Sequence, residues 1–143
     1  MKKIIQSLFL FLIGGISYHF IEILWRGYSH FSMFVLGGIC FVTIGLMREY
    51  FVENNIGILT QLIVACITIT ALELIFGLIL NIVFKLDIWD YSDLRFNFLG
   101  QISLLYSVFW IFLSLPIIII DGFLKYWFFG KEKPDYRIIN NYK

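Results

Sequence analysis

The chain has 143 residues, of which 60% are hydrophobic, 20% are aromatic and only 15% are charged. A water-soluble domain of this size cannot bury so much apolar surface, so the composition excludes an ordinary soluble protein and indicates that a lipid bilayer is the solvent. The net charge is +1 and the Lys and Arg residues are scattered, which leaves no basic block of the kind that binds nucleic acid.

The first apolar segment, at about residues 4–25, is long enough to cross a bilayer. Its basic start resembles a secretory signal, but no A-x-A-like cleavage site follows, so we expect a spanning helix. Tyr18, Glu22 and Arg26 are spaced by four and therefore lie along one stripe, in which Glu22 can pair with Arg26. The alternative is that Glu22 extends to the membrane interface.

Two further apolar segments follow, at about 32–48 and about 57–84. The second of these is long enough to tilt, to break near Gly77 or to project from the bilayer, and the sequence does not choose among these outcomes. Glu73 lies about eleven residues inside its expected end, which places it ~16 Å deep, close to the bilayer centre.

Glu73 is the strongest single pointer to function in the sequence. Lipid offers no hydrogen bond to a carboxyl group, so an ionisable residue at this depth must turn inward. We expect Glu73 to be buried and to face the first helix, with its polar partners among Tyr18, Arg26, Asn81 and Gln101.

The fourth apolar segment is expected at about 97–120, after a polar loop that contains Asp90. Asn97 and Gln101 are spaced by four at its expected start and add hydrogen-bonding groups on the same side as Asp90. A second stripe of this helix indicates helix packing more than a pore lining. Its residues are Ser103, Ser107, Trp110 and Ser114.

Lys and Arg residues predict the orientation, because those near helix ends are retained on the cytoplasmic side. With both termini inside, eight of the eleven lie on that side. They are Lys2, Lys3, Arg48, Lys125, Lys131, Lys133, Arg137 and Lys143, whereas Arg26, Lys85 and Arg95 lie outside. We therefore predict an all-α, multi-pass protein of the cell membrane, with a four-helix domain at 1–122 and an interfacial and cytoplasmic tail at 123–143.

An internal match suggests a duplication. Residues 28–39 align without gaps on residues 91–102, at an offset of 63, with shared Tyr, Ser, Leu, Gly and Ile. The match predicts equivalent backbone in the two segments and two parallel-repeat hairpins, at about 4–48 and 57–120. Some transporters build a site between repeats of this kind.

Four polar motifs stand out in the sequence, namely Arg26-Gly27-Tyr28-Ser29-His30, Glu73-x3-Gly77-x3-Asn81, Trp89-Asp90-Tyr91-Ser92 and Gly100-Gln101-Ile102. These motifs resemble those of a bacterial family labelled putative ABC-transporter permease of the CmpB type. The resemblance covers about residues 10–121, and Phe31 stands where Trp is expected. The family name implies ATP-driven transport, but the inner loop at about 48–56 contains no segment for docking on an ATPase.

The leading hypothesis is a permease-like protein with a polar, outward-facing cavity between the two hairpins. The rival is a non-transporting assembly or regulatory subunit in which the same groups join the helices, and a third is an intramembrane enzyme that uses His30 with Glu22. The residues expected to bind substrate are Glu22, Arg26, His30, Glu73, Asn81, Asp90, Asn97 and Gln101.

Catalysis and metal binding have little support in the sequence. No nucleophile elbow or Walker A motif is present, so we predict neither a catalytic residue nor a cofactor. A metal site made by Glu22, His30 and Asp90 is conceivable, but no His-x-x-x-His or Cys-rich cluster supports one. The expected partners are the bilayer, a small-molecule or ion substrate, and a second copy or another membrane protein.

Overall fold

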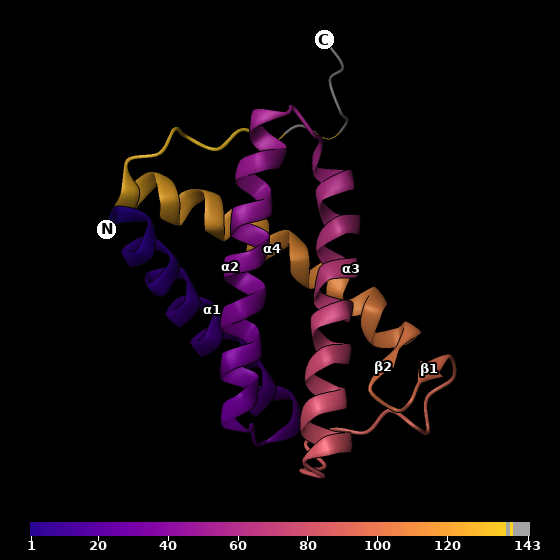
Figure 1. Cartoon of the computed structure of the whole chain (residues 1–143). Helices are drawn as coiled ribbons and strands as arrows, with labels where there is room; N and C mark the ends of the chain where they lie inside the picture. The colour runs from indigo at the N-terminus through magenta and orange to yellow at the C-terminus, as the bar shows by residue number, and fades with distance from the viewer. Residues whose placement is uncertain (137, 139–143) are drawn as a thin grey trace.

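The computed structural model describes residues 1–136 and 138, and in this part of the chain four helices are long and apolar enough to cross a membrane (Figure 1). The all-helical class is thus confirmed, with a π-helix and a small two-stranded sheet in addition. The elements are α1 (Lys2–Arg26), α2 (Phe31–Glu53), α3 (Ile58–Gly77), η1 (Leu78–Val83), β1 (Asn97–Phe98), β2 (Ile102–Ser103) and α4 (Leu104–Phe129).

Helix α2 lies between α1 and α3 and is the most buried of the four (Figure 1). Its inward residues, including Leu36, Cys40 and Ile44, form the core together with Ile69 of α3 and Ile118 of α4. The outer faces of the other helices expose Leu, Ile and Phe, as expected where lipid replaces water.

Helices α1 and α2 pack backbone against backbone. A Cβ atom on Gly14 would lie 2.9 Å from the carbonyl oxygen of Gly37, and one on Gly38 would lie 2.8 Å from that of Phe11. Small residues allow such close approach between membrane helices, and any larger side chain would separate them. The contact between α1 and α2 is the most extensive helix pairing in the bundle.

The third span changes from an α-helix to a π-helix without an interruption. Helix α3 ends at Gly77 and continues directly as the π-helix η1, so the two together run from Ile58 to Val83. The predicted span of 57–84 is confirmed, and of the three alternatives left open the structure has a change of helix type after Gly77. A π-helical segment turns its side chains to new directions, and such segments are frequent at functional sites.

The second and fourth helices differ from their predicted limits. Helix α2 extends to Glu53 instead of ending at about residue 48, so the linker to α3 is only residues 54–57. Helix α4 begins at Leu104, not at about 97, because Phe96, Leu99 and Gly100 have positive φ angles that a helix does not allow. Ser103 then caps α4, its side chain accepting a hydrogen bond from a backbone amide of the first turn.

Helix α4 also continues past the predicted boundary at residue 122 and ends at Phe129, before Gly130 in a left-handed conformation. The aromatic residues that were assigned to an interfacial tail are thus part of the helix. Arg137 and Lys143, which the topology prediction counts, lie outside the described residues.

The predicted equivalence of residues 28–39 and 91–102 is wrong. In the first segment a helix begins at Phe31, whereas the second forms turns and the β1–β2 hairpin and contains no helix. The matching letters therefore adopt different backbones. The arrangement as two parallel-repeat hairpins stays a prediction, although α1 with α2 and α3 with α4 are the two most extensive helix pairs.

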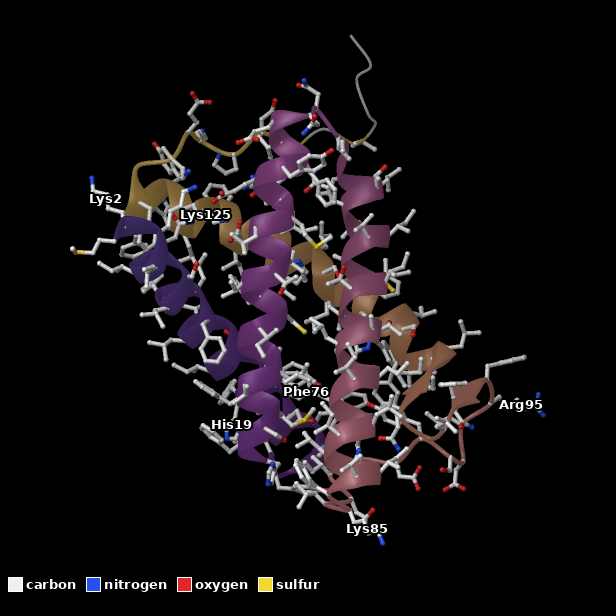
Figure 2. The ribbon with its side chains drawn as sticks, viewed as in Figure 1. Lys2, His19, Phe76, Lys85, Arg95 and Lys125 are labelled. Carbon is white, nitrogen blue, oxygen red and sulfur yellow. The ribbon has the colours of Figure 1, made fainter. Side chains whose placement is uncertain are left out.

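The two ends of the bundle differ in the segments that they contain. The start of α1, the α2–α3 linker and the end of α4 lie at one end, whereas the α1–α2 turn and the long loop before α4 lie at the other (Figure 1). Figure 2 accordingly shows Lys2 and Lys125 toward one end and Lys85 and Arg95 at the opposite end.

Candidate functional site

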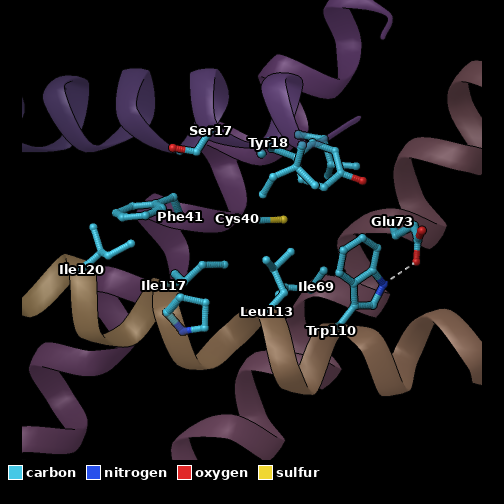
Figure 3. A pocket seen from close by; sticks show the side chains of 15 residues that line it. Ser17, Tyr18, Cys40, Phe41, Ile69, Glu73, Trp110, Leu113, Ile117 and Ile120 are labelled. Carbon is cyan, nitrogen blue, oxygen red and sulfur yellow. Dashed lines mark hydrogen bonds between the residues drawn. The ribbon is translucent and has the colours of Figure 1, made fainter. Parts of the chain in front are cut away.

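Glu73 is held inside the bundle by two neutral donors. The residue is 2% exposed, and its carboxyl group accepts a hydrogen bond from the Tyr91 hydroxyl at 3.0 Å. It accepts a second one from the Trp110 indole nitrogen at 2.9 Å (Figure 3). The predicted burial is observed. The predicted partners are wrong, because the loop after η1 brings Tyr91 over the carboxylate and α4 presents Trp110 to it.

Tyr91 belongs to the loop, outside the membrane-spanning helices. Burial, together with the nearby Glu73 carboxylate, raises the pKa of its phenol well above the ordinary value. Its hydroxyl therefore remains a proton donor to Glu73 throughout the physiological range. The ring stacks on Tyr106 of α4, with 4.4 Å between centroids, which fixes the loop on the helix.

Asn81 and Gln101 meet in a second cluster. The amide nitrogen of Asn81 donates to Gln101 Oε1 at 2.8 Å and to the carbonyl oxygen of Trp89 at 2.9 Å, and its Oδ1 accepts from the Ile88 amide at 2.7 Å. A Cβ atom on Gly77 would lie 2.5 Å from Gln101 Oε1, so a glycine is required where this side chain enters. The cluster ties the loop to η1 and leaves the Asn81 amide fully hydrogen-bonded.

Glu22 and Arg26 form the predicted ion pair. Arg26 Nη2 lies 2.7 Å from Glu22 Oε1, and the Ser29 hydroxyl donates to the other carboxylate oxygen at 2.6 Å. Arg26 Nη1 also donates to the Ile88 carbonyl oxygen at 3.1 Å, and the guanidinium lies over the Tyr28 ring. The amide of Ile88 donates to Asn81, so Ile88 connects Arg26 of α1 to the cluster of Asn81 and Gln101.

His30, Asp90 and Asn97 do not join these groups. His30 Nδ1 caps α2 by accepting from the Ser32 amide at 3.2 Å. Asp90 is exposed, and hydrogen bonds from the amide and hydroxyl of Ser92 hold the pKa of its carboxyl below the ordinary value. Asn97 bonds to backbone atoms of its own loop. The eight predicted residues thus separate into three clusters and three local caps and turns.

A groove between α1 and α4 passes two of these clusters. The helices are close where Phe9 contacts Phe128, with 5.3 Å between ring centroids, and diverge toward the end that holds Glu22 and Arg26 (Figure 1). The diverging part encloses a cavity of about 390 Å³ whose polar lining residues include Glu22, Arg26 and Tyr91. Its volume falls within the ordinary range for small-molecule sites.

A smaller cavity of about 140 Å³ continues the groove toward the centre of the bundle. Figure 3 shows its side chains converging from all four helices, with Tyr18 of α1 opposite Leu113 of α4 and Glu73 beside Trp110. The two cavities share lining residues and therefore adjoin, and together we call them the lateral groove. The shared residues are Tyr18, Ile21, Trp110, Leu113 and Pro116.

A buried ion cluster at the opposite end was not predicted. Asp121 is fully buried, and its Oδ2 lies 3.1 Å from Lys125 Nζ and 3.8 Å from Arg48 Nη1. Lys125 also lies 3.2 Å from Glu49. The predicted ends of the second and fourth helices, at about 48 and 120, left these residues in loops. The four-residue spacing of Asp121 and Lys125 was the signal available in the sequence.

The described residues, 1–136 and 138, contain no group of three His, Cys, Asp or Glu side chains that could hold a metal ion. In particular, Glu22 binds Arg26 and Ser29, while His30 and Asp90 are engaged with neighbours in their own loops. The site is therefore a set of hydrogen-bonding side chains around an apolar groove.

Comparison with known proteins supports a membrane protein of transport type. No curated protein and no solved structure matches the chain. The resemblance noted in the sequence is confirmed by a family model that extends over residues 9–133, nearly the entire chain. The chain belongs to the family described as putative ABC-transporter type IV.

Proposed function

We propose that the chain is a permease-like transport protein whose substrate binds in the lateral groove between α1 and α4. The observation that carries the proposal is the cavity of about 390 Å³ that brings the Glu22–Arg26 ion pair and Tyr91 next to apolar and aromatic walls. Family membership and four apolar helices support a membrane protein of transport type.

The geometry also favours one alternative, a non-transporting assembly or regulatory subunit. The cluster of Asn81, Gln101 and Trp89 is buried, and its hydrogen bonds are made within the chain, as in a purely structural joint. The enzyme hypothesis has less support, because His30 faces Ser32 and not Ser29 or Glu22. We therefore propose that the chain is not an enzyme.

We further propose a multi-pass protein of the cell membrane with both termini cytoplasmic. The excess of Lys and Arg at the end of the bundle that holds the N-terminus supports this orientation. The α2–α3 linker on that side is only residues 54–57, too short for a helix that seats on an ATPase. Energy coupling would therefore need a partner membrane protein or a second copy of the chain.

Cysteine accessibility tests both the cavity and the orientation. The native Cys40 and Cys66 are replaced by Ala, and single cysteines are introduced at Ile21 in the groove, at Leu24 on the outer face and at Ser92 in the loop. A permease needs water in its site, so we expect a charged, membrane-impermeant thiol reagent to label Ile21→Cys much faster than Leu24→Cys.

Ser92→Cys should react from the extracytoplasmic side of intact cells. Labelling of Ile21→Cys no faster than that of Leu24→Cys would exclude a water-accessible site and support the assembly subunit. Labelling of Ser92→Cys from the cytoplasmic side alone would reverse the proposed orientation.

A further inference from the structure

We infer that the lateral groove binds a zwitterionic, single-chain amphiphile, which enters from one leaflet of the bilayer with its acyl chain along the groove and its head group at Glu22 and Arg26. This inference rests on the cavity of the proposed function and adds the chemical class of its ligand. The head group meant here carries one anionic and one cationic group, as a phosphoethanolamine does.

The groove has two zones of different chemistry. Its outer end holds the ion pair of Glu22 and Arg26, whereas Leu113, Pro116 and Ile117 line the inner part. On α1 the lining residues run from Gly14 to Arg26, a rise of ~18 Å, which is about half of the ~30 Å hydrocarbon thickness of a bilayer. A polar end at the interface and an apolar trough one leaflet deep match the shape of a lipid chain with its head group.

The mouth of the groove faces the bilayer. Trp25 is 72% exposed and Phe112 is 71% exposed, and they line the opening from α1 and α4 respectively. Trp side chains such as that of Trp25 are favoured where hydrocarbon meets polar head groups. Pro116 lacks an amide hydrogen for the carbonyl oxygen of Phe112, so one backbone acceptor in this wall has no helical partner.

The charges at the outer end favour a zwitterion. Glu22 and Arg26 lie side by side with opposite charges, so a purely anionic head group would be attracted by the guanidinium but repelled by the carboxylate, and a cationic head group the reverse. The Arg26 side chain is 22% exposed, and the bonds to Ile88 and Glu22 use two of its five N–H donors. A phosphate can accept from a further N–H of Nη1 or Nη2 while an ammonium donates to Glu22.

A second helix is a poorer occupant than a lipid chain. Membrane helices associate through small residues that allow their backbones to approach, and the glycines of α1, Gly14 and Gly15, already face α2. The groove instead presents bulky side chains, Tyr106, Phe109 and Trp110 among them. Their irregular surface suits a flexible chain better than a rigid cylinder.

Photo-crosslinking of the full chain tests the inference. The protein is reconstituted in phosphatidylcholine vesicles with a lysophosphatidylethanolamine that carries a diazirine in its acyl chain, and labelled residues are mapped by mass spectrometry. We expect saturable labelling of groove residues on α1 and α4. Unlabelled lysophosphatidylethanolamine should compete about tenfold better than lysophosphatidylglycerol with the same chain, since each charge-assisted hydrogen bond is worth about that factor.

Matched variants separate the two zones. Leu113→Trp fills the trough and should remove most of the saturable labelling, whereas Ile111→Trp, outside the groove on the same helix, should not. Glu22→Gln combined with Arg26→Gln should keep the labelling but abolish the preference between the two head groups. Both results are needed for the inference to stand.

Other outcomes would overturn it. Labelling that does not saturate and falls equally on outward residues such as Leu8 and Ile16 would show only the lipid annulus, and equal competition by both lysolipids would exclude the zwitterion. Crosslinks between two copies through the groove would show a docking surface for a helix. Photo-crosslinking does not depend on transport, so the two proposals can fail separately. Saturable photo-crosslinking together with no reaction of Ile21→Cys with the thiol reagent would refute only the permease. Reaction of Ile21→Cys without saturable photo-crosslinking would refute only this inference.

Discussion

Two carboxyl groups, those of Asp121 and Glu73, are buried in the bundle in different surroundings. Asp121 lies beside the cations Lys125 and Arg48, whereas within the described part of the chain Glu73 receives hydrogen bonds from the neutral Tyr91 and Trp110 alone. The first carboxylate is part of a compact ion cluster. The second borders the lateral groove, which suggests that the carboxyl group paired with cations joins helices while the one held by neutral donors beside a cavity is available to a ligand.

The largest expected effect is at the ion cluster. Asp121→Leu should lower the free energy of unfolding by about 3–5 kcal/mol, because it leaves Lys125 and Arg48 buried without their shared anion. Unfolding of the purified chain in mixed micelles by a denaturing detergent would measure it. Adding Lys125→Met should recover part of the loss, and a double variant as unstable as the single one would contradict the role given to the ion pair.

Glu73→Leu should cost less, about 1–3 kcal/mol, because the fully buried Trp110 nitrogen loses its acceptor while the Tyr91 hydroxyl is only half-buried. Glu73→Gln keeps an acceptor and should fold nearly as well as the wild type. The same unfolding assay compares them.

The effect of Glu73→Gln on function separates the two roles of this residue more clearly than its effect on stability does. If Glu73 serves the ligand, Glu73→Gln should change the photo-crosslinking or transport signal without loss of stability. If it only joins helices, Glu73→Gln should leave the signal of both assays unchanged, and the distinction drawn between Asp121 and Glu73 would fail.

Gly77→Ala tests the space that admits Gln101. The new methyl group would approach Gln101 Oε1 to 2.5 Å, and the crowding, at about 1–3 kcal/mol, outweighs the gain of about 1 kcal/mol in helix propensity. We expect a modest net loss of stability. The NMR shift of the Trp89 indole N–H should also change, because this group donates a hydrogen bond to the backbone carbonyl oxygen of Gln101. An unchanged indole signal would mean that the side chain moves aside freely.

The smallest effect is expected in the exposed loop. Because hydrogen bonds from Ser92 lower the pKa of Asp90 in the folded chain, they add stability above the ordinary pKa of ~3.9 that is lost as the pH falls through the lowered value. Ser92→Ala should raise the pKa of Asp90 toward the ordinary value, as measured by carboxyl NMR. Unfolding near neutral pH should hardly change, since the group is exposed.

Features that depend on the residues of a single helix, such as the spans, could be predicted from the sequence. Features that depend on contacts between distant segments, such as the partners of Glu73, could not. The four spans follow from hydropathy, and the burial of Glu73 follows from the absence of hydrogen bonds in lipid. Its partners could not be predicted, because Tyr91 reaches it only after η1 and the loop have folded back. The late start of α4 depends on positive φ angles at Phe96 and Leu99, residues that carry no turn signal.

The close α1–α2 seam determines which part of the molecule can move. Gly14 and Gly38 place the two backbones in direct contact, so α1 cannot slide or tilt without carrying α2 with it. Helix α4 has no such seam with α1 and contains Pro116, where a helix bends at low cost. Any widening of the space between α1 and α4 should therefore be a swing of one half of α4 about Pro116 against a rigid two-helix wall.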